Sequence, residues 1–493
     1  MKIEEIEQKY SFKFIGVPEE KGGVIYLDVR KDDFLKACLA LHAELGSPVK
    51  IFFADDDRGD VENFCLYCGF EDAVRGKWMF VRLMVARSAP EFPSLAKEIF
   101  SANLFEKEIF EMFGIIPVGN PDTRRLRLHD EVWPCGAYPL RKDFNLNSEC
   151  KGERGIYKFK KIEGSGVFEV PVGPVHAGII GPGHFRFSVA GEPIINLEIR
   201  LGFAHSLALC NAVEKICGTI CPENAELARA IFLELERMHN HIIDIGTMAL
   251  DVAYSFPHAY ASVMKEYLLT VNEKLTGSRY LRSACIPGGV SKDISGADSI
   301  FVSGCMDEVM KDFRELKEML FSNASFMDRV DSTGVLGRKV AEDLGVTGLA
   351  ARASGIDLDL RKDFSGIYRK VKFNTAKEVS GDVLARLSVR MKEFEESAKL
   401  VKQFVAMLKE GEAYRLEIAE IKQGFALGYA EGWRGPVIYW VRLSSEGIIE
   451  RCKIVDPSFN NWQGLAYALP GNIIPDFPLI NKSFNLSYSG NDL

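Results

Sequence analysis

The sequence predicts a multidomain α+β protein, with a small α+β N-terminal domain followed by a larger, mainly helical domain that has β-strands at its margins. Its 493 residues, 47% of them hydrophobic and 26% charged, are typical of a folded protein and exceed what one hydrophobic core usually organises. Short apolar runs between turn residues fill the first 145 residues. Helical periodicity dominates after Pro222, so the two parts of the chain belong to different architectures.

The first domain is expected over residues 1–145. Asp32 can cap a helix whose apolar residues fall on one side and which ends at Gly46. Three apolar runs separated by charged or glycine-containing turns then predict antiparallel strands. They cover residues 49–53, 64–68 and 79–85.

Residues 146–166 are polar and lack periodicity, which is typical of a linker. The second domain is expected over residues 167–493. Its opening, residues 168–187, is rich in Gly, Pro and Val and predicts strands with tight turns. After Pro222, apolar residues recur at steps of three and four, which predicts a long helix.

Further helices are predicted by three amphipathic segments of the second domain. These segments are residues 263–282, 300–321 and 381–409. From Val437 onward the pattern predicts short strands and loops.

Charge and hydropathy exclude several classes of function. A net charge of -8 argues against a nucleic-acid partner, whose binding face would be basic. No apolar run approaches the ~20 residues that cross a bilayer, and the N-terminus lacks the apolar core of a signal peptide. We therefore expect a cytoplasmic protein that reaches a membrane only through partners.

Familiar catalytic motifs are missing. The sequence contains no Walker A motif, no H-E-x-x-H and no G-x-S-x-G. Gly181-Pro182-Gly183 lacks the third glycine and the helix of a dinucleotide fingerprint, so we do not expect NAD to bind to this chain itself.

Two cysteine pairs invite a metal interpretation. Cys65 and Cys68 lie on a predicted strand, where residues three apart point to opposite faces. Cys217 and Cys221 would share a face of a helix, but Cys221 precedes a proline, which disfavours helical backbone there. We favour a structural role for both pairs.

Five histidines are candidate ligands. His176, His184 and His205 lie within 30 residues, whereas His239 and His241 lie two apart on the long predicted helix. That spacing separates their rings by roughly 200°, so they cannot bind one ion together. A structural role is favoured for each of the five.

Several strings resemble known subunits. Residues 106–115 (EKEIFEMFGI) and 139–144 (PLRKDF) resemble the C subunit of bacterial NADH-quinone oxidoreductase. Other strings resemble the D subunit of the same enzyme and the related hydrogenase large subunits, and they occur in the same order. They are residues 173–176 (GPVH), 212–215 (AVEK), 234–237 (ELER), 286–290 (IPGGV) and 345–348 (GVTG).

The resemblance implies a fused C/D subunit, similar to the large subunit of group 4 nickel–iron hydrogenases of the formate-hydrogenlyase and energy-converting type. It implies an oxidoreductase of electron transport that couples to ion translocation at the cytoplasmic face of the inner membrane. The implied partners are an iron–sulphur small subunit, a ferredoxin-like subunit and antiporter-like membrane subunits. Iron–sulphur clusters would lie in a partner, quinone would be the family's acceptor, and no cofactor is expected on this chain.

The family's metal ligands are missing from this chain. Hydrogenases of the family use two C-x-x-C pairs as thiolate ligands, and soft thiolates are what that metal chemistry requires. At the C-terminal pair this sequence resembles the family but has Ser487 and Gly490. At the early pair, Gly202 joins Phe203 directly and the intervening segment is absent. We therefore expect no nickel–iron centre and no metal ligand in this chain.

The resemblance also implies a quinone pocket and a proton relay. His176 matches one histidine of the family's quinone loop, and the second histidine position is Ile180. Asp251 matches an acidic residue beneath the quinone-site histidine. A His–Asp pair can relay a proton, so His176 and Asp251 are the candidate site residues.

Two functions remain open from the sequence. The chain is either a redox subunit with a degenerate quinone or acceptor pocket, in an enzyme similar to NADH-quinone oxidoreductase, or a non-catalytic scaffold. The scaffold would dock an iron–sulphur subunit and transmit conformational change to membrane subunits. An isolated soluble enzyme has the least support, because no complete catalytic constellation is present.

Overall fold

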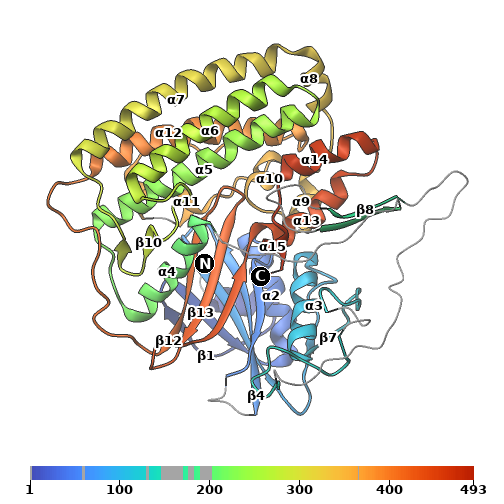
Figure 1. The fold of residues 1–493 in the computed structure, drawn as a ribbon. Coiled ribbons are helices and arrows are strands. Elements are labelled where there is room, and N and C mark those ends of the chain that lie inside the picture. Colours follow the sequence, from blue (N-terminus) through green and yellow to red (C-terminus); the bar gives the residue numbers. More distant parts are fainter. Residues whose placement is uncertain are drawn as a thin grey trace, which may run out of the picture. The chain divides into compact units, whose positions relative to one another are not determined.

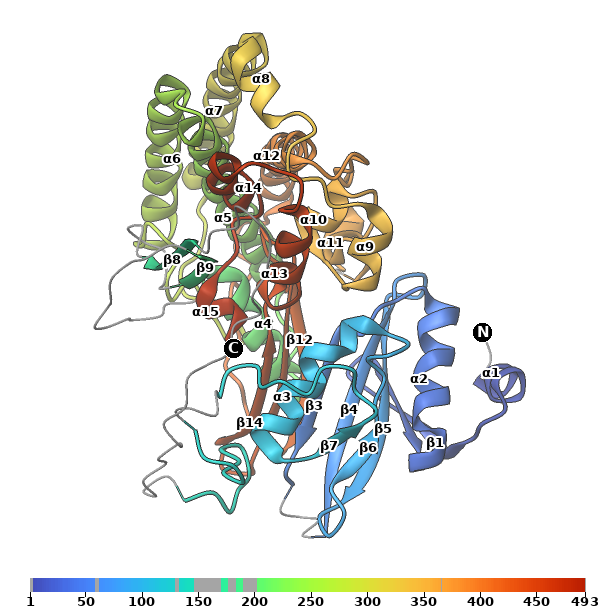
Figure 2. The ribbon, with the colours of Figure 1, turned by 90° about the vertical axis from the view of Figure 1, so that its right-hand side faces the viewer.

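The computed structural model describes residues 3–57, 62–128, 133–145, 202–364 and 366–492, together with the backbone of two strands at 170–175 and 183–188. The chain divides into two compact units (Figures 1 and 2). The N-terminal unit comprises Met1–Asp72, Lys77–Ile199 and Ser487–Asp492. The C-terminal unit is formed mainly by Arg200–Leu486. His176 and the linker expected over residues 146–166 lie outside the described residues.

A five-stranded sheet organises the N-terminal unit, in the order β1-β2-β5-β4-β3. All of its pairings are antiparallel except that of β2 with β5. The strands are β1 (Phe14–Lys21), β2 (Val24–Val29), β3 (Ile51–Asp55), β4 (Asn63–Asp72) and β5 (Lys77–Ala86). The three predicted antiparallel strands are confirmed as β3, β4 and β5, while β1 and β2 were not predicted.

Helix α2 (Lys31–Leu45) confirms the predicted helix and packs against this sheet (Figure 2). The predicted cap was wrong, because Arg30 is the N-cap residue and Asp32 lies inside the first turn. The helix buries Phe34, Cys38 and Leu41 and ends where Gly46 adopts a left-handed φ of 59°. A side chain with a Cβ would be strained there, so glycine is the natural stop signal.

Helix α3 (Asn103–Phe113) carries the EKEIFEMFGI string. The carboxylate of Glu106 is fully buried and accepts hydrogen bonds from Ser94 Oγ (2.6 Å), the Leu95 N–H (2.6 Å) and Asn120 Nδ2 (2.7 Å). This residue therefore fixes two loops to the helix. The remaining elements are α1 (Ile3–Tyr10), β6 (Glu91–Pro93), η1 (Phe100–Ala102), β7 (Ile116–Val118), β8 (Val170–Val175) and β9 (Gly183–Ser188).

Four long helices lie side by side in the C-terminal unit (Figure 1). They are α5 (Glu223–Asp251), α6 (Ser255–Thr276), α7 (Gly296–Ser322) and α12 (Val383–Met407). All four confirm predicted helices, and their facing apolar residues form one hydrophobic core.

A three-stranded antiparallel sheet, β12-β13-β14, flanks this bundle. The strands are β12 (Gly424–Glu431), β13 (Pro436–Leu443) and β14 (Ile449–Val455), and α4 (Phe203–Cys217) packs against β12 and β13. Short elements complete the unit. They are β10 (Cys285–Ile286), β11 (Gly289–Val290), α8 (Ala324–Val330), α9 (Arg338–Asp343), α10 (Gly348–Ala353), α11 (Leu360–Asp363), η2 (Tyr368–Lys370) and η3 (Ile474–Asp476).

The prediction of strands and loops after Val437 was right for β13 and β14 but wrong further on. The chain forms α13 (Pro457–Ala468), α14 (Phe477–Phe484) and α15 (Tyr488–Asn491). The start of α13 carries a readable signal, because the Asp456 side chain accepts the Ser458 N–H at 2.8 Å and Pro457 occupies the first helical turn.

Within the described ranges, no helix combines the length and the apolar character that crossing a membrane requires.

Candidate functional site

A stripe of polar residues, most of them buried, runs along helix α5. Its members recur at steps of three, four and seven, and at 100° per residue they occupy an arc of about 100°. We call them the α5 stripe: Glu234, Arg237, His241, Asp244 and Asp251. The first four are buried and Asp251 is half-buried. The spacing of its apolar residues predicted this helix. The polar residues recur at the same steps, and this spacing could have indicated the buried polar site, but the sequence analysis did not use it.

Glu234 anchors one end of the stripe in a set of buried partners. Its carboxylate lies 3.1 Å from Arg361 and 3.3 Å from Arg237, and it accepts a hydrogen bond from Ser397 Oγ at 2.6 Å. The Tyr368 hydroxyl donates to the same carboxylate. Burial alone would raise the pKa of Glu234, but Arg361 and Arg237 outweigh it and lower that pKa.

Arg352 joins two further carboxylates to the stripe. Its Nε donates to Glu393 at 2.9 Å, and its Nη1 lies 2.8 Å from Glu431 and 3.6 Å from Asp359. Glu393 in turn accepts from His241 Nε2 at 2.8 Å. These contacts link β12, α10, α12 and α5 into one buried ion network. Its members are Glu234, Arg237, Arg352, Asp359, Arg361, Glu393 and Glu431, with His241 attached.

The protonation states within this network differ between its members. Burial lowers the pKa of His241, which then serves Glu393 as a neutral N–H donor. Burial would raise the pKa of Glu393, but Arg352 and His241 hold it well below its usual range. Burial and the neighbouring Asp359 raise the pKa of Glu431 to about 7. Glu431 is therefore the network carboxyl that can exchange a proton near neutral pH.

The stripe continues one turn beyond His241. The Asp244 carboxylate lies 3.2 Å from Arg390 Nε and accepts from Asn485 Nδ2 at 2.7 Å. Arg390 also donates to the Ser483 carbonyl at 2.6 Å. The end of helix α14 is thus tied to the middle of α5.

Asp251, a predicted site residue, closes α5. Its Oδ2 is buried and has no hydrogen-bond partner among the described residues, and burial raises the pKa of this carboxyl to about 6 against an opposing effect of Lys482. No described contact joins it to Asp244. Its predicted partner His176 lies outside the described residues, so the His176–Asp251 relay stays a prediction.

Hydrogen bonds at helix starts occur at both places where the sequence is expected to lack the family's metal ligands. Ser487 begins α15, and its Oγ accepts the Gly490 N–H at 3.0 Å. At the early position α4 begins at Phe203, and the Glu236 carboxylate accepts the N–H groups of Phe203 (2.6 Å) and Ala204 (3.1 Å). In the part of the chain that the structure describes, no group of three or more His, Cys, Asp or Glu side chains could hold a metal.

The cysteine pairs lie as their sequence positions predicted. Cys65 and Cys68 are both buried on β4. Cys217 is the last residue of α4, and Gly218, with a left-handed φ of 70°, ends that helix before Cys221. The two thiols therefore do not share a helical face.

His239 and His205 make structural hydrogen bonds. His239 Nδ1 bonds the Leu235 carbonyl at 3.0 Å, and His205 bridges Tyr439 and Asp456, each at 3.1 Å. The side chain of His184, on β9, lies outside the described residues.

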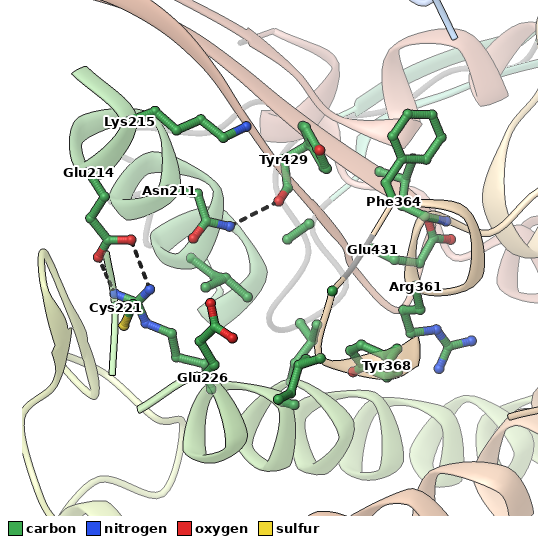
Figure 3. Close-up of a pocket in the computed structure, with 18 of the residues that line it drawn as sticks. Asn211, Glu214, Lys215, Cys221, Glu226, Arg361, Phe364, Tyr368, Tyr429 and Glu431 are labelled. Carbon is green, nitrogen blue, oxygen red and sulfur yellow. Dashed lines mark hydrogen bonds and ion pairs between the residues drawn. The ribbon is translucent and has the colours of Figure 1, made fainter. Parts of the chain in front are cut away.

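A cavity of about 400 Å³ lies beside the ion network in the C-terminal unit (Figure 3). Helices α4 and α5, strand β12 and the segment 360–368 enclose it. Glu431 and Tyr429 line it from β12 and Glu226 lines it from α5. At another wall Lys215 donates to the Leu427 carbonyl at 2.8 Å and lies 4.6 Å from the Tyr429 ring, and burial lowers its pKa to about 8.

Two family models match the chain. Residues 27–150 match the 30 Kd subunit of respiratory-chain NADH dehydrogenase, and residues 244–423 match its 49 Kd subunit. Formate hydrogenlyase subunit 5 of Escherichia coli is 30% identical over 92% of this chain and 86% of its own length. The C/D subunit of NADH-quinone oxidoreductase from Bacteroides thetaiotaomicron is 28% identical over 76% of this chain and 80% of its own length.

A solved structure is similar as well. It is a chain of the membrane-bound sulfane sulfur reductase, described as an archaeal respiratory membrane complex. The TM-score is 0.54 at 27% identity, covering 57% of this chain and 79% of that chain.

Proposed function

Because this chain belongs to the family that unites the fused C/D subunits of NADH-quinone oxidoreductases with the large subunits of group 4 hydrogenases, we propose that it is the redox-site subunit of a membrane-bound, complex I-like oxidoreductase that works without a nickel–iron centre. One observation carries the proposal. The likeness to formate hydrogenlyase subunit 5 spans 92% of the chain, and by the resemblance drawn from the sequence Ser487 and Gly490 would take the positions of two of the family's metal thiolates.

The chemistry left to this chain is the handling of protons. The ion network and the α5 stripe supply two carboxyls with raised pKa values, the buried Glu431 (about 7) and the half-buried Asp251 (about 6). Electron arrival at a neighbouring redox centre favours proton uptake, and such carboxyls can supply it. A plain scaffold has no need of buried carboxyls that are poised in this way.

The electron-carrying groups belong to partners in this proposal. An iron–sulphur small subunit and a ferredoxin-like subunit would bring electrons, and antiporter-like membrane subunits would use the released energy to move ions. The chain would sit at the cytoplasmic face of the inner membrane. Quinone is the proposed acceptor, with Asp251 and His176 in its pocket.

Purification of the intact complex through a tag on this chain tests the proposal. Mass spectrometry of the detergent-solubilised assembly should identify iron–sulphur and membrane subunits. The assembly should then transfer electrons from NADH or reduced ferredoxin to a water-soluble quinone, with inorganic polysulfide as a second acceptor to be tried. A chain that purifies alone from the soluble fraction would overturn the proposal.

One substitution separates a redox site from a scaffold. Asp251→Asn should lower turnover at least 10-fold in a complex that assembles normally. The matched control is Asp307→Asn, at an exposed carboxyl on α7, which should leave turnover unchanged. Equal activity of both variants would favour the scaffold.

A further inference from the structure

The ion network carries one more acid than base. Each of its side chains is at most 2% exposed, so solvent does not screen an imbalance. Four carboxyls face three guanidiniums, and His241 is a neutral donor. The carboxyls belong to Glu234, Asp359, Glu393 and Glu431, and the guanidiniums to Arg237, Arg352 and Arg361. A buried net charge is costly, so one carboxyl is expected to hold a proton.

Geometry selects which carboxyl holds that proton. Asp359 and Glu431 approach the same nitrogen of Arg352, at 3.6 Å and 2.8 Å, so two like charges compete for one cation. Asp359 has a second cation, since Arg361 contacts both of its oxygens at 3.0 Å and 2.7 Å. Among the described residues, the second oxygen of Glu431 accepts a hydrogen bond only from the Leu360 N–H, at 3.3 Å. Glu431 is thus the least compensated carboxyl.

Glu431 is also the network carboxyl that faces an open space. Of the four carboxyls, only Glu431 lines the cavity of about 400 Å³. That volume admits water molecules, and the exposed Glu226 on the same lining marks the way toward solvent.

We propose that Glu431 is the group at which the buried ion network takes up and releases a proton, and that the cavity beside it is the path of that proton to solvent. The site deepens the proposed function, because it would supply protons to the redox subunit. The raised pKa of Glu431 agrees with this assignment. Several charged groups face it from the surrounding elements. They are Arg237 and Glu234 on α5, Arg352 on α10, Asp359, Arg361 on α11, Glu393 on α12 and Lys215 on α4 across the cavity.

Proton release would change the number of carboxylates that Arg352 neutralises. With Glu431 neutral, three guanidiniums balance three carboxylates. When Glu431 loses its proton to water in the cavity, Arg352 must serve Glu431 as well as Glu393 and Asp359. The interaction of Arg352 with Glu393 then weakens, and Glu393 becomes a better acceptor for the His241 N–H. The protonation state of Glu431 thereby changes the hydrogen bond of His241 on the α5 stripe.

Thermal unfolding of the purified complex at two pH values tests the assignment. Glu431→Gln keeps the shape and the hydrogen bonds of the protonated form. Because the folded-state pKa of Glu431 is raised above its usual value, the wild type loses stability as pH rises toward 7, and the variant does not. The Tm of Glu431→Gln should therefore equal or exceed that of the wild type at pH 8 and differ little at pH 5. The control is Glu446→Gln, an exposed carboxyl between β13 and β14. A lower Tm of Glu431→Gln at pH 8, or its failure to fold, would show an ionised salt-bridge partner and overturn the proposal.

Carbodiimide labelling of the wild-type complex gives a second readout that needs no variant. Dicyclohexylcarbodiimide reacts with protonated carboxyls in apolar surroundings. Peptide mass spectrometry should find Glu431 labelled at pH 6 and several-fold less at pH 8, with Glu393 unlabelled at both. Absence of label on Glu431 at pH 6 would contradict the proposal that Glu431 is protonated and reached through the cavity. Neither measurement depends on turnover. A complex that reduces no tested acceptor would therefore refute the proposed function, whereas the assignment of the proton to Glu431 would still be decided by the Tm and labelling results.

Discussion

Ser487 Oγ accepts the backbone N–H of Gly490 at 3.0 Å, so the two residues proposed to occupy the family's late thiolate positions are hydrogen-bonded to each other. The interaction caps α15 in the manner of any serine at a helix start. Gly490 is buried, so a larger side chain there would have to displace its surroundings.

Restoring the two thiols should not restore the metal centre. In Ser487→Cys/Gly490→Cys only two of four thiolates return, because no cysteine lies between Cys150 and Phe203, where the early pair is expected. Two soft ligands do not hold the nickel–iron centre of this family, so we expect no stoichiometric nickel in the double variant. Elemental analysis after growth with added nickel checks this expectation. One nickel per chain would mean that other residues complete the ligand set.

Arg352→Met should destabilise the C-terminal unit strongly. The substitution leaves the buried Glu393 without its nearest cation, and breaking such a pair costs about 3–5 kcal/mol. The control is Arg338→Gln, whose pair with Glu342 is exposed and contributes below about 0.5 kcal/mol. Urea unfolding followed by circular dichroism gives both free energies. A loss below about 1 kcal/mol for Arg352→Met would show that the network is not closed as described.

The Asp251 carboxyl should weaken the fold at high pH. Its folded-state pKa of about 6 lies above the ordinary 3.8, so its stabilising contribution is complete below pH 4 and is lost as pH rises through 6. Asp251→Asn removes this loss. Two pKa units correspond to about 3 kcal/mol, which partial solvent exposure reduces to about 1–2 kcal/mol.

Unfolding free energies at pH 5 and pH 8 measure this effect. The variant should gain stability over the wild type at pH 8, and the gain should shrink at pH 5. If the variant and the wild type differ by the same unfolding free energy at pH 5 and at pH 8, the pKa of Asp251 is not raised.

The two-domain interpretation predicts where proteases cut first. Residues 146–166 are polar and lack periodicity, and such segments are cleaved before buried helices. Brief trypsin treatment should first cut at a lysine or arginine in this stretch, giving fragments near residues 1–150 and 160–493. Early cuts within α5, between Glu223 and Asp251, would contradict the interpretation.

The elements that could be predicted from the sequence are those whose signals are local. Helix α2 was found from its one-sided apolar residues and Gly46, and α5 from Pro222 and its apolar steps, because stop signals and periodicity act within a few turns. Strand β12 was missed because most of its side chains are buried on both faces, which removes the alternation that marks a strand. Helix α13 was missed although Asp456 and Pro457 announce its start.

The candidate site was only partly predictable. Asp251 was named through a family resemblance, whereas the ion network joins α5 to Arg352, Glu393 and Glu431, which lie about 100 to 200 positions away in the sequence. Such pairings depend on how α10, α12 and β12 pack, and no local pattern reports that. The spacing of Glu234, Arg237 and His241 by three and four positions does indicate a polar face on this helix.

Nickel and hydrogen assays on the intact complex test the central claim most directly. The complex, purified through a tag on this chain and analysed by inductively coupled plasma mass spectrometry, should contain iron from its partners but no stoichiometric nickel. It should neither consume nor evolve hydrogen while it transfers electrons to another acceptor. One nickel per copy of this chain, together with hydrogen turnover, would contradict the account.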